Sequence, residues 1–230
     1  LQNIKTFNSI VRGPPLLYEI FKWIIQKPSV LSVSPSLVHV FTKSSLKLKI
    51  PDLEYVISPA SFKEGTVGLL DKVSGMTLGV WQTRPKSNGY VKINSKNIHE
   101  PPIINPNYLS DPYDVDVLLK SIKIGRNLLS TSPLQPYLNG QTNPSNYLQT
   151  DDELLSWARN EGITVYHMIG TAKMGPKSDK LAVVNNKLKV RGIESLRVAD
   201  ASIMPTMPSG NTNAPTMMIA EKASDMILGK

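Results

Sequence analysis

The chain has 230 residues, 40% of them hydrophobic, so it can bury a core large enough for one sizeable domain or two small ones. Its net charge of +8 comes largely from scattered lysines without interleaved aromatic residues, so we expect no nucleic-acid partner. Such a charge more often favours solubility or steers an acidic ligand or partner. No apolar run approaches the roughly 20 residues that cross a bilayer, and no transmembrane segment is predicted.

Residues that bind metals or form cross-links are scarce. The chain has no cysteine, which excludes disulfides and thiolate metal sites. The three histidines, His39, His99 and His167, lie far apart in the sequence without ligand spacing, so no metal site is predicted. The first residue is Leu, and nothing near it has the layout of a signal peptide, which indicates a processed chain or part of a longer product.

The first hundred residues predict one helix and several strands. A helix is expected over 16–25, after Pro14-Pro15, and a strand or buried segment over 36–40. Extended apolar runs predict three further strands, within 53–60, 75–85 and 89–94. Because the turn signal Asn88-Gly89 lies between the last two, we expect them to form an antiparallel hairpin within a larger sheet.

Two helices are predicted in the middle of the chain. Asp111 suits the N-cap and Pro112 the first turn of one helix, and Gly162 ends the other, which begins with a capping box at Thr150. Residues 132–146 are rich in Pro, Asn and Gln, as is typical of a loop. One face of the first helix is expected to pack on the sheet, namely Val115, Leu118, Leu119, Ile122, Arg126 and Leu129.

The last third predicts short strands and a final helix. Residues 163–175 are a strand-like apolar segment that enters a glycine-containing turn. Two short strands, 188–190 and 196–199, are expected around the turn at Arg191-Gly192. The final helix is expected over 214–228, ended by Gly229 and capped by Asn213, with an apolar stripe of Ile219, Ala220, Ala223, Met226 and Ile227.

Two stretches of this last third have the sequences YHMIGTAKMG and LKVRGIESLRVADASIMPTMPSGNTNAPTMMIAEKASDMI. They closely resemble the C-terminal block of the glucose–methanol–choline (GMC) oxidoreductases, which are FAD enzymes that include choline dehydrogenases and related alcohol dehydrogenases and oxidases. Upstream, RPKSNGYVKI and PPIINPNYLSDPYDVDVLLKSIKIGRNLL resemble the family's substrate-domain sheet and helix. The resemblance covers the chain well from about Met76 to the C-terminus and weakly over the first fifty residues.

The resemblance implies an α+β fold in two parts. Residues 1–155 are expected to form a substrate-binding domain, an antiparallel sheet backed by helices. Residues 156–230 are expected to be the C-terminal segment of an FAD-binding Rossmann-like α/β domain, completed by another segment or chain. The implied reaction is the oxidation of a small primary alcohol, choline-like or aromatic, to the aldehyde, by hydride transfer to flavin N5.

The resemblance also assigns residues to this chemistry. The family's general base falls on His167, and its second catalytic position, His in some members and Asn in others, falls on Asn211. Residues implied to contact the FAD cofactor are Tyr166, Asp200, Ala201, Thr212 and Asn213.

Elementary chemistry agrees with these roles. A neutral histidine accepts a hydroxyl proton, and a carboxamide holds the same oxygen in line. The N–H groups that begin the helix after Asn213 suit negative charge on a reduced flavin.

Each assigned residue also has an ordinary structural interpretation. Taken alone, His167 is typical of a partly buried, hydrogen-bonded histidine, and Asp200 of a strand end. Asn211 and Asn213 suit turn and cap positions, where asparagine is common. Only the ordered set favours a flavin site. His39 and His99 are interpreted as surface or core residues.

The chain departs from the family in one important respect. The G-x-G-x-x-G pattern that binds the FAD pyrophosphate is absent from all 230 residues, so an N-terminal FAD-binding half is expected as another part of the protein or a separate polypeptide. Ala172 stands where many relatives have Cys, and Asn185-Asn186 where Asp-Pro is common. Three alternatives stay open: a flavin-containing lyase or photodecarboxylase, a non-catalytic basic binding module, and a half with a purely structural role.

Overall fold

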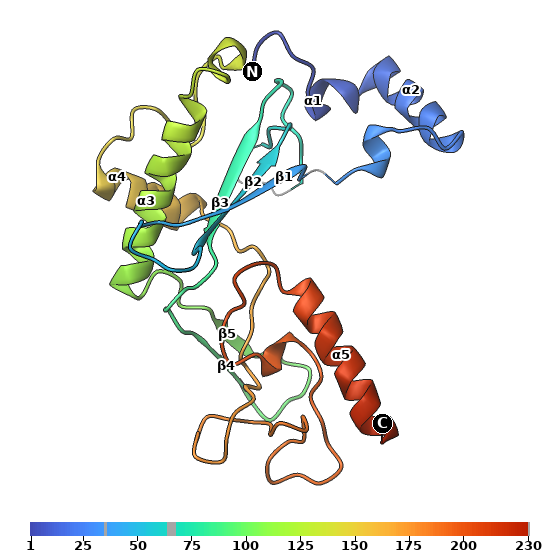
Figure 1. Cartoon of the computed structure of the whole chain (residues 1–230), viewed down its shortest axis with the longest axis vertical. Helices are drawn as coiled ribbons and strands as arrows, with labels where there is room; N and C mark the ends of the chain where they lie inside the picture. Colours follow the sequence, from blue (N-terminus) through green and yellow to red (C-terminus); the bar gives the residue numbers. More distant parts are fainter. Residues whose placement is uncertain (35, 64–67, 230) are drawn as a thin grey trace. The chain divides into compact units, whose positions relative to one another are not determined.

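The computed structural model describes residues 1–34, 36–63 and 68–229. The chain divides into two compact units, one made of residues 1–82 and 116–163 and the other of residues 83–115 and 164–230. Each unit combines helices with antiparallel strands, so the mixed α+β architecture expected from the sequence is confirmed (Figure 1). The separation into a substrate-binding part and a flavin-binding part stays a prediction.

The first unit contains a three-stranded antiparallel sheet in the order β1–β2–β3 (Figure 1). Its strands are β1 (Val38–Thr42), β2 (Leu53–Ser58) and β3 (Thr77–Gln82). Tyr55 of β2 lies opposite Val40 of β1 and Val80 of β3. These strands lie within or beside the segments predicted as extended. The central strand β2 is almost wholly buried, including the Glu54 carboxylate, which lies 2.9 Å from His39 Nδ1.

Helix α3 (Pro112–Leu129) packs on this sheet through small residues. The Tyr55 hydroxyl donates to the Ser121 carbonyl oxygen at 2.7 Å, and its burial raises the pKa of Tyr55 to about 12. A Cβ on Gly125 would lie 3.3 Å from Leu78 Cδ2 and 3.4 Å from a Tyr55 ring carbon. The buried face is therefore centred on Val117, Ser121 and Gly125, next to the face predicted from apolar spacing. The predicted packing of this helix on the sheet is confirmed, and Ile122 of the predicted face is buried. The closest contacts lie at Ser121 and Gly125, beside that face, because close packing on the sheet favours small side chains there.

The predicted caps of α3 and α4 (Asp151–Glu161) are confirmed. Asp111 Oδ1 accepts from the Tyr113 N–H at 2.8 Å, and Thr150 and Glu153 form a reciprocal capping box before α4. Arg126, predicted on the apolar face, instead donates to the carbonyl oxygens of Ser145 and Leu148, in the turn that leads into α4. The loop over 132–146 contains only the short helix η2 (Gln135–Tyr137).

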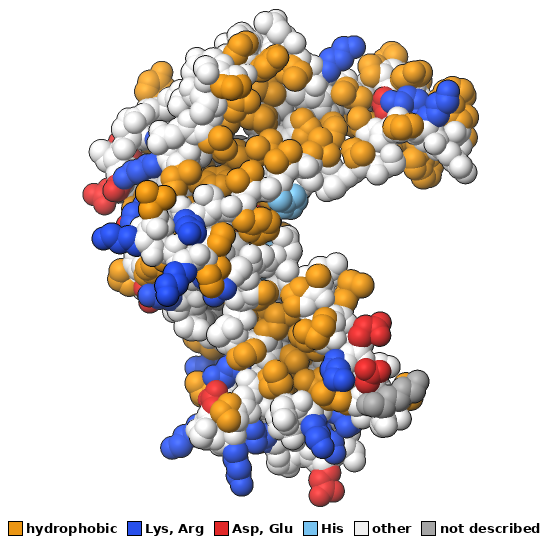
Figure 2. Space-filling model, viewed as in Figure 1, with side chains coloured by type: hydrophobic (Ala, Val, Ile, Leu, Met, Phe, Trp, Pro, Cys, Tyr) orange, Lys and Arg blue, Asp and Glu red, His pale blue; other side chains and the backbone are white. Residues whose placement is uncertain are grey.

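The N-terminal elements are α1 (Phe7–Ile10), α2 (Gly13–Ile24) and η1 (Val30–Ser32). Helix α2 confirms the predicted helix and begins a few residues earlier, with Pro14 and Pro15 in its first turn. Lys22 and the Val30 N–H bond to the Glu19 carboxylate and lower its pKa to about 2. Hydrophobic side chains gather over α2 in Figure 2, and several are exposed: Leu17, Tyr18, Phe21, Trp23 and Ile24.

The second unit contains a two-stranded antiparallel ladder, β4 (Tyr90–Lys92) with β5 (Ile103–Asn105). The predicted hairpin was therefore wrong, because β3 pairs with β2, and β4 pairs with β5. The buried Asp114 carboxylate accepts the N–H groups of Lys86 and Ser87, which holds the segment before Asn88-Gly89 in a non-hairpin conformation. A Cβ on Gly89 would lie 2.0 Å from the Asn105 carbonyl oxygen, so this glycine serves close approach to the end of β5.

Only isolated bridges form where two short strands were expected around Arg191-Gly192. The Val190 N–H donates to the Leu196 carbonyl at 3.0 Å, and Lys189 bridges Arg197. Leu188 and Ser195 have left-handed φ values of 61° and 60°, which interrupt extended backbone on both sides of the turn. The strand expected over 163–175 is broken in the same way by Tyr166, with φ 61°.

Helix α5 (Asn213–Leu228) ends at Gly229, which has φ 70°, as predicted. Its inner face joins η3 (Ala201–Ile203) in the core of the second unit. The buried residues of this core are Val184, Leu188, Ile203, Met204, Ile219 and Ala223. Ala220 and Ile227, which the predicted stripe included, are exposed. This core fixes the position of α5 and therefore of the turn at its N-terminus.

Within the described residues, no helix is both long and apolar enough to cross a membrane.

Candidate active site

The turn Ser209–Thr212 leads directly into α5, and Thr212 is the N-cap residue of that helix. Threonine at this position commonly accepts a hydrogen bond from a first-turn N–H, but the Thr212 side chain makes no such bond. Asn213 is the first helical residue, so the expectation that it caps α5 was wrong. The Thr212 side chain is instead buried, with 7% of the residue exposed, and it points to another segment.

That segment contains His167, whose two ring nitrogens both have partners from the turn. The His167 Nδ1 atom lies 3.0 Å from Thr212 Oγ1. The His167 Nε2 atom lies 3.1 Å from Asn211 Nδ2. The imidazole and the carboxamide that the sequence assigned to one site are therefore in direct contact, although they are 44 residues apart in the chain.

These contacts favour one tautomer of the neutral ring. A carboxamide nitrogen only donates, so His167 Nε2 accepts the hydrogen bond from Asn211 and carries a lone pair. The neutral ring then has its proton on Nδ1, which donates to the Thr212 hydroxyl oxygen. Because His167 is half-buried and Asn211 is exposed, the Nε2 side of the ring is the side that a small molecule can reach.

The backbone at His167 is held in an unusual conformation. Tyr166 has a φ of 61°, which is uncommon for an aromatic residue and costs energy that other contacts must supply. The Tyr166 N–H donates to Thr164 Oγ1, and the Thr164 hydroxyl accepts from Tyr108. Gly170, with φ 85°, turns the chain again three residues after the histidine. Tyr166 itself is 68% exposed.

Two charged residues that the sequence interpretation missed support the turn. Arg84 donates to the Ser209 hydroxyl, at the start of the turn that holds Asn211. The segment that follows Arg84 is fixed by Asp114, through the N–H groups of Lys86 and Ser87. The sequence placed Arg84 at the end of the predicted strand 75–85 and in the stretch that resembles the family's substrate-domain sheet. No local signal indicated that it would bond to Ser209, 125 residues later.

Asp200 and Ala201, which were also predicted to contact the cofactor, make no hydrogen bond to His167 among the described residues. Asp200 is the N-cap of η3, and its Oδ1 accepts from the Ser202 N–H at 2.7 Å. Ala201 is partly buried against the core beneath α5. The assignment of Asp200 and Ala201 to the cofactor stays a prediction, as do those of Tyr166 and Asn213.

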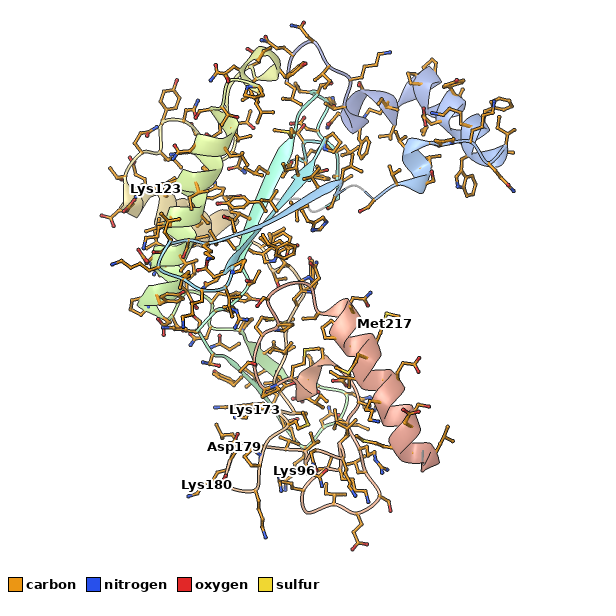
Figure 3. The ribbon with its side chains drawn as sticks, in the orientation of Figure 1. Lys96, Lys123, Lys173, Asp179, Lys180 and Met217 are labelled. Carbon is orange, nitrogen blue, oxygen red and sulfur yellow. The ribbon has the colours of Figure 1, made fainter. Side chains whose placement is uncertain are left out.

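The basic surface of this unit is separate from the His167 group. Lys173 and Asp179 form an ion pair at 2.8 Å, and Figure 3 shows their side chains close together, with Lys180 nearby. The hydrogen bond from Lys173 lowers the pKa of Asp179. Two shallow hollows here are lined by Lys177, Asn185 and Arg191, among others, and by none of His167, Asn211 or Thr212. No cluster of three potential metal ligands occurs among the residues that the structure describes.

Comparison with known proteins identifies the family. The family model described as GMC oxidoreductase matches residues 85–220, which is more than half of the chain and includes His167 and Asn211. The chain belongs to the GMC oxidoreductases. The resemblance seen in the sequence is thus confirmed, and GMC oxidoreductases are FAD-binding enzymes that act on CH–OH donors.

Curated relatives extend the match over nearly the whole chain. An alcohol dehydrogenase [acceptor] of Pseudomonas putida is 36% identical over 228 residues, which is 97% of this chain and 40% of that protein. An oxygen-dependent choline dehydrogenase of Photobacterium profundum is 35% identical over 208 residues, covering 90% of this chain and 36% of its own length. This GMC chain therefore spans well under half the length of the curated relatives it matches.

Solved structures show the same fold. A formate oxidase of Aspergillus oryzae RIB40, which contains FAD, superposes with a TM-score of 0.85 at 21% identity, covering 97% of this chain and 44% of the oxidase. A fungal aryl-alcohol oxidase gives a TM-score of 0.64 at 27% identity, covering 78% of this chain and 28% of its own.

Proposed function

We propose that this chain supplies the catalytic end of an FAD-dependent alcohol oxidoreductase, in which His167 accepts the substrate's hydroxyl proton and Asn211 positions the substrate's oxygen. The observation that carries this proposal is the contact of His167 Nε2 with Asn211 Nδ2 at 3.1 Å, on the accessible side of the imidazole. Membership of the GMC family supplies the class of reaction.

The groups at the start of α5 fit a flavin. The N–H groups of Asn213 and Ala214 have no acceptor within the helix, and the Thr212 side chain does not cap them. Pro215 follows in the same turn, where a missing N–H costs nothing. This end of α5 carries partial positive charge and suits an anionic group such as the pyrimidine edge of the flavin. Bound FAD would supply the acceptor for the hydride that leaves the substrate carbon.

The work of His167 follows from its tautomer. The Nε2 lone pair, which accepts from Asn211 in the structure, is the atom that can take a proton from an alcohol. Losing that proton and a hydride together converts a primary alcohol to an aldehyde. The Nδ1–H remains bonded to Thr212 throughout, so the imidazolium that forms keeps a hydrogen-bond acceptor on its other side.

Asn211 gives the alcohol a defined position. A hydroxyl both donates and accepts, so it can donate to His167 Nε2 while it accepts from Asn211 Nδ2. In this arrangement the substrate oxygen lies between Asn211 and His167, in place of their direct hydrogen bond, and bonds to both side chains. Fixing the oxygen in this way orients the carbon that loses hydride.

The substrate that we propose is a small primary alcohol, choline-like or aromatic. The relatives support this class, since they include choline dehydrogenases, an alcohol dehydrogenase and an aryl-alcohol oxidase. The pyrophosphate of FAD would be bound elsewhere, because G-x-G-x-x-G is absent from the 230 residues. We infer that an N-terminal FAD-binding half completes the enzyme, in agreement with the longer relatives.

The proposal is tested by anaerobic rapid mixing of the complete flavoprotein with a panel of primary alcohols, recording the flavin absorbance. We expect at least one alcohol to bleach the flavin and His167→Ala to slow the bleaching by about a hundredfold or more, because an acid–base group is lost. His99→Ala, at an exposed histidine, is the matched control and should bleach at the wild-type rate. No bleaching with any alcohol would favour the lyase or decarboxylase alternative, and unimpaired His167→Ala would remove the base assignment.

A further inference from the structure

The resemblance assigned Thr212 to the cofactor, which stays a prediction, and the structure shows that its hydroxyl also contacts His167. The Oγ1 atom lies 3.0 Å from His167 Nδ1, and Thr212 is almost fully buried, so this hydroxyl is shielded from water. Its backbone carbonyl accepts from the Thr216 N–H and from the Thr216 hydroxyl, which fixes the residue from the first turn of α5. The direction of the Thr212 side chain is therefore set by the start of the helix.

We propose that Thr212 is a positioning residue that holds His167 as the Nδ1–H tautomer and thereby keeps Nε2 free as the proton acceptor. This inference rests on the proposed function for its consequence in catalysis, but the tautomer itself does not depend on it.

The physical reason is a competition between two neutral forms of the ring. A neutral imidazole carries one N–H, and the partner of one nitrogen decides which form is present. Asn211 Nδ2 only donates, so its contact with Nε2 requires a lone pair there. The Thr212 hydroxyl can donate or accept, and in this arrangement it accepts from Nδ1–H in a position shielded from water. The opposite tautomer would place Nε2–H against the Asn211 N–H donor and leave Nε2 without a lone pair for the substrate.

The rest of the turn makes this arrangement specific to the threonine. A hydroxyl that capped α5 would point at the first-turn N–H groups and leave Nδ1 unpaired, but no such cap bond is present. Because the Thr212 hydroxyl does not cap α5, the first N–H groups of the helix stay available to another hydrogen-bond acceptor. Serine at this position would retain the hydroxyl, whereas valine would keep the shape and lose the acceptor.

The test is a ¹⁵N NMR measurement of the histidine ring nitrogens in the complete protein, with the His167 signals identified by their loss in His167→Gln. In the wild type we expect a protonated Nδ1 and an unprotonated Nε2. In Thr212→Val the population should move to the Nε2–H form, and Thr212→Ser should restore the wild-type pattern. Thr212→Ala repeats the loss of the hydroxyl with less side chain, in case valine is not accommodated.

Catalysis provides the second readout. Flavin reduction by alcohol should slow by about tenfold or more in Thr212→Val, because losing a group that orients a functional side chain commonly costs at least this factor. The rate should recover in Thr212→Ser. An unchanged Nδ1–H tautomer in both Thr212→Val and Thr212→Ala would overturn the inference. If the tautomer moves while wild type and variants alike fail to oxidise any alcohol, the role of Thr212 stands and the proposed function fails.

Discussion

Asn211 bonds to the ring nitrogen that we propose as the base, so its own contribution can be measured separately. Asn211→Ala removes the donor that would hold the substrate oxygen but leaves His167 and its bond to Thr212 in place. We expect flavin reduction to slow by about tenfold to a hundredfold, because the oxygen is less well oriented, while the flavin stays bound. Single-turnover reduction and the ratio of bound flavin to protein measure the two effects.

Asn186→Ala is the matched control for this variant, since Asn186 is an exposed asparagine of the same unit and is not part of the His167 group. It should leave both quantities unchanged. Loss of flavin from Asn211→Ala, with normal reduction of whatever flavin remains, would make Asn211 a cofactor-binding residue and contradict its positioning role.

At this scale the sequence predicted which residues belong together but not how they bond. The ordered motifs around His167 and Asn211 indicated one site, and the two side chains do meet. The direction of the Thr212 hydroxyl could not be predicted, because a threonine before a helix ordinarily caps it. The hydroxyl instead contacts His167, which lies 45 residues earlier in the chain. The support from Arg84 was equally invisible, since it depends on a contact across 125 residues.

Elements were predicted well where the signal was local and poorly where the partner was distant. The caps at Asp111 and Thr150, and the stop at Gly229, involve neighbours in sequence and are as expected. The Asn88-Gly89 signal failed, because the carboxylate of Asp114 and the strand β5 supply stronger partners than a hairpin turn would. Left-handed backbone at Tyr166 and Leu188 interrupts two segments that were expected to be extended, and the residue types there gave no sign of it.

The role of Gly89 gives a test of this interpretation. In Gly89→Ala the new methyl group would meet backbone atoms, 2.0 Å from the Asn105 oxygen and 2.6 Å from Pro106, and these atoms cannot move aside cheaply. We expect the free energy of unfolding to fall by about 1–3 kcal/mol, as in other overpacked sites. Urea denaturation followed by circular dichroism measures this change.

Gly79→Ala is the control, since its methyl group would meet nothing closer than 3.9 Å in β3. Its free energy of unfolding should stay within about 0.5 kcal/mol of the wild type. Equal stability of the two variants would show that Gly89 does not pack against the end of β5 as the structure indicates.

For the whole molecule, the chain contains the residues that we propose as reacting side chains but lacks the pyrophosphate-binding glycines. His167, Asn211 and Thr212 all lie in the unit made of residues 83–115 and 164–230. G-x-G-x-x-G is absent from the sequence, and the Pseudomonas putida relative is matched over only 40% of its length. We therefore expect the 230 residues alone to hold FAD poorly and the complete protein to hold it well, since the ADP part of the cofactor needs its own site.

The most direct test of the central proposal is a crystal structure of the complete protein with FAD bound. We predict that the His167 imidazole and the Asn211 carboxamide face the same side of one isoalloxazine ring, within reach of a single substrate oxygen, with the start of α5 at the ring's pyrimidine edge. A flavin bound away from these residues, or the two side chains turned into separate pockets, would contradict the assignment of this group to alcohol oxidation.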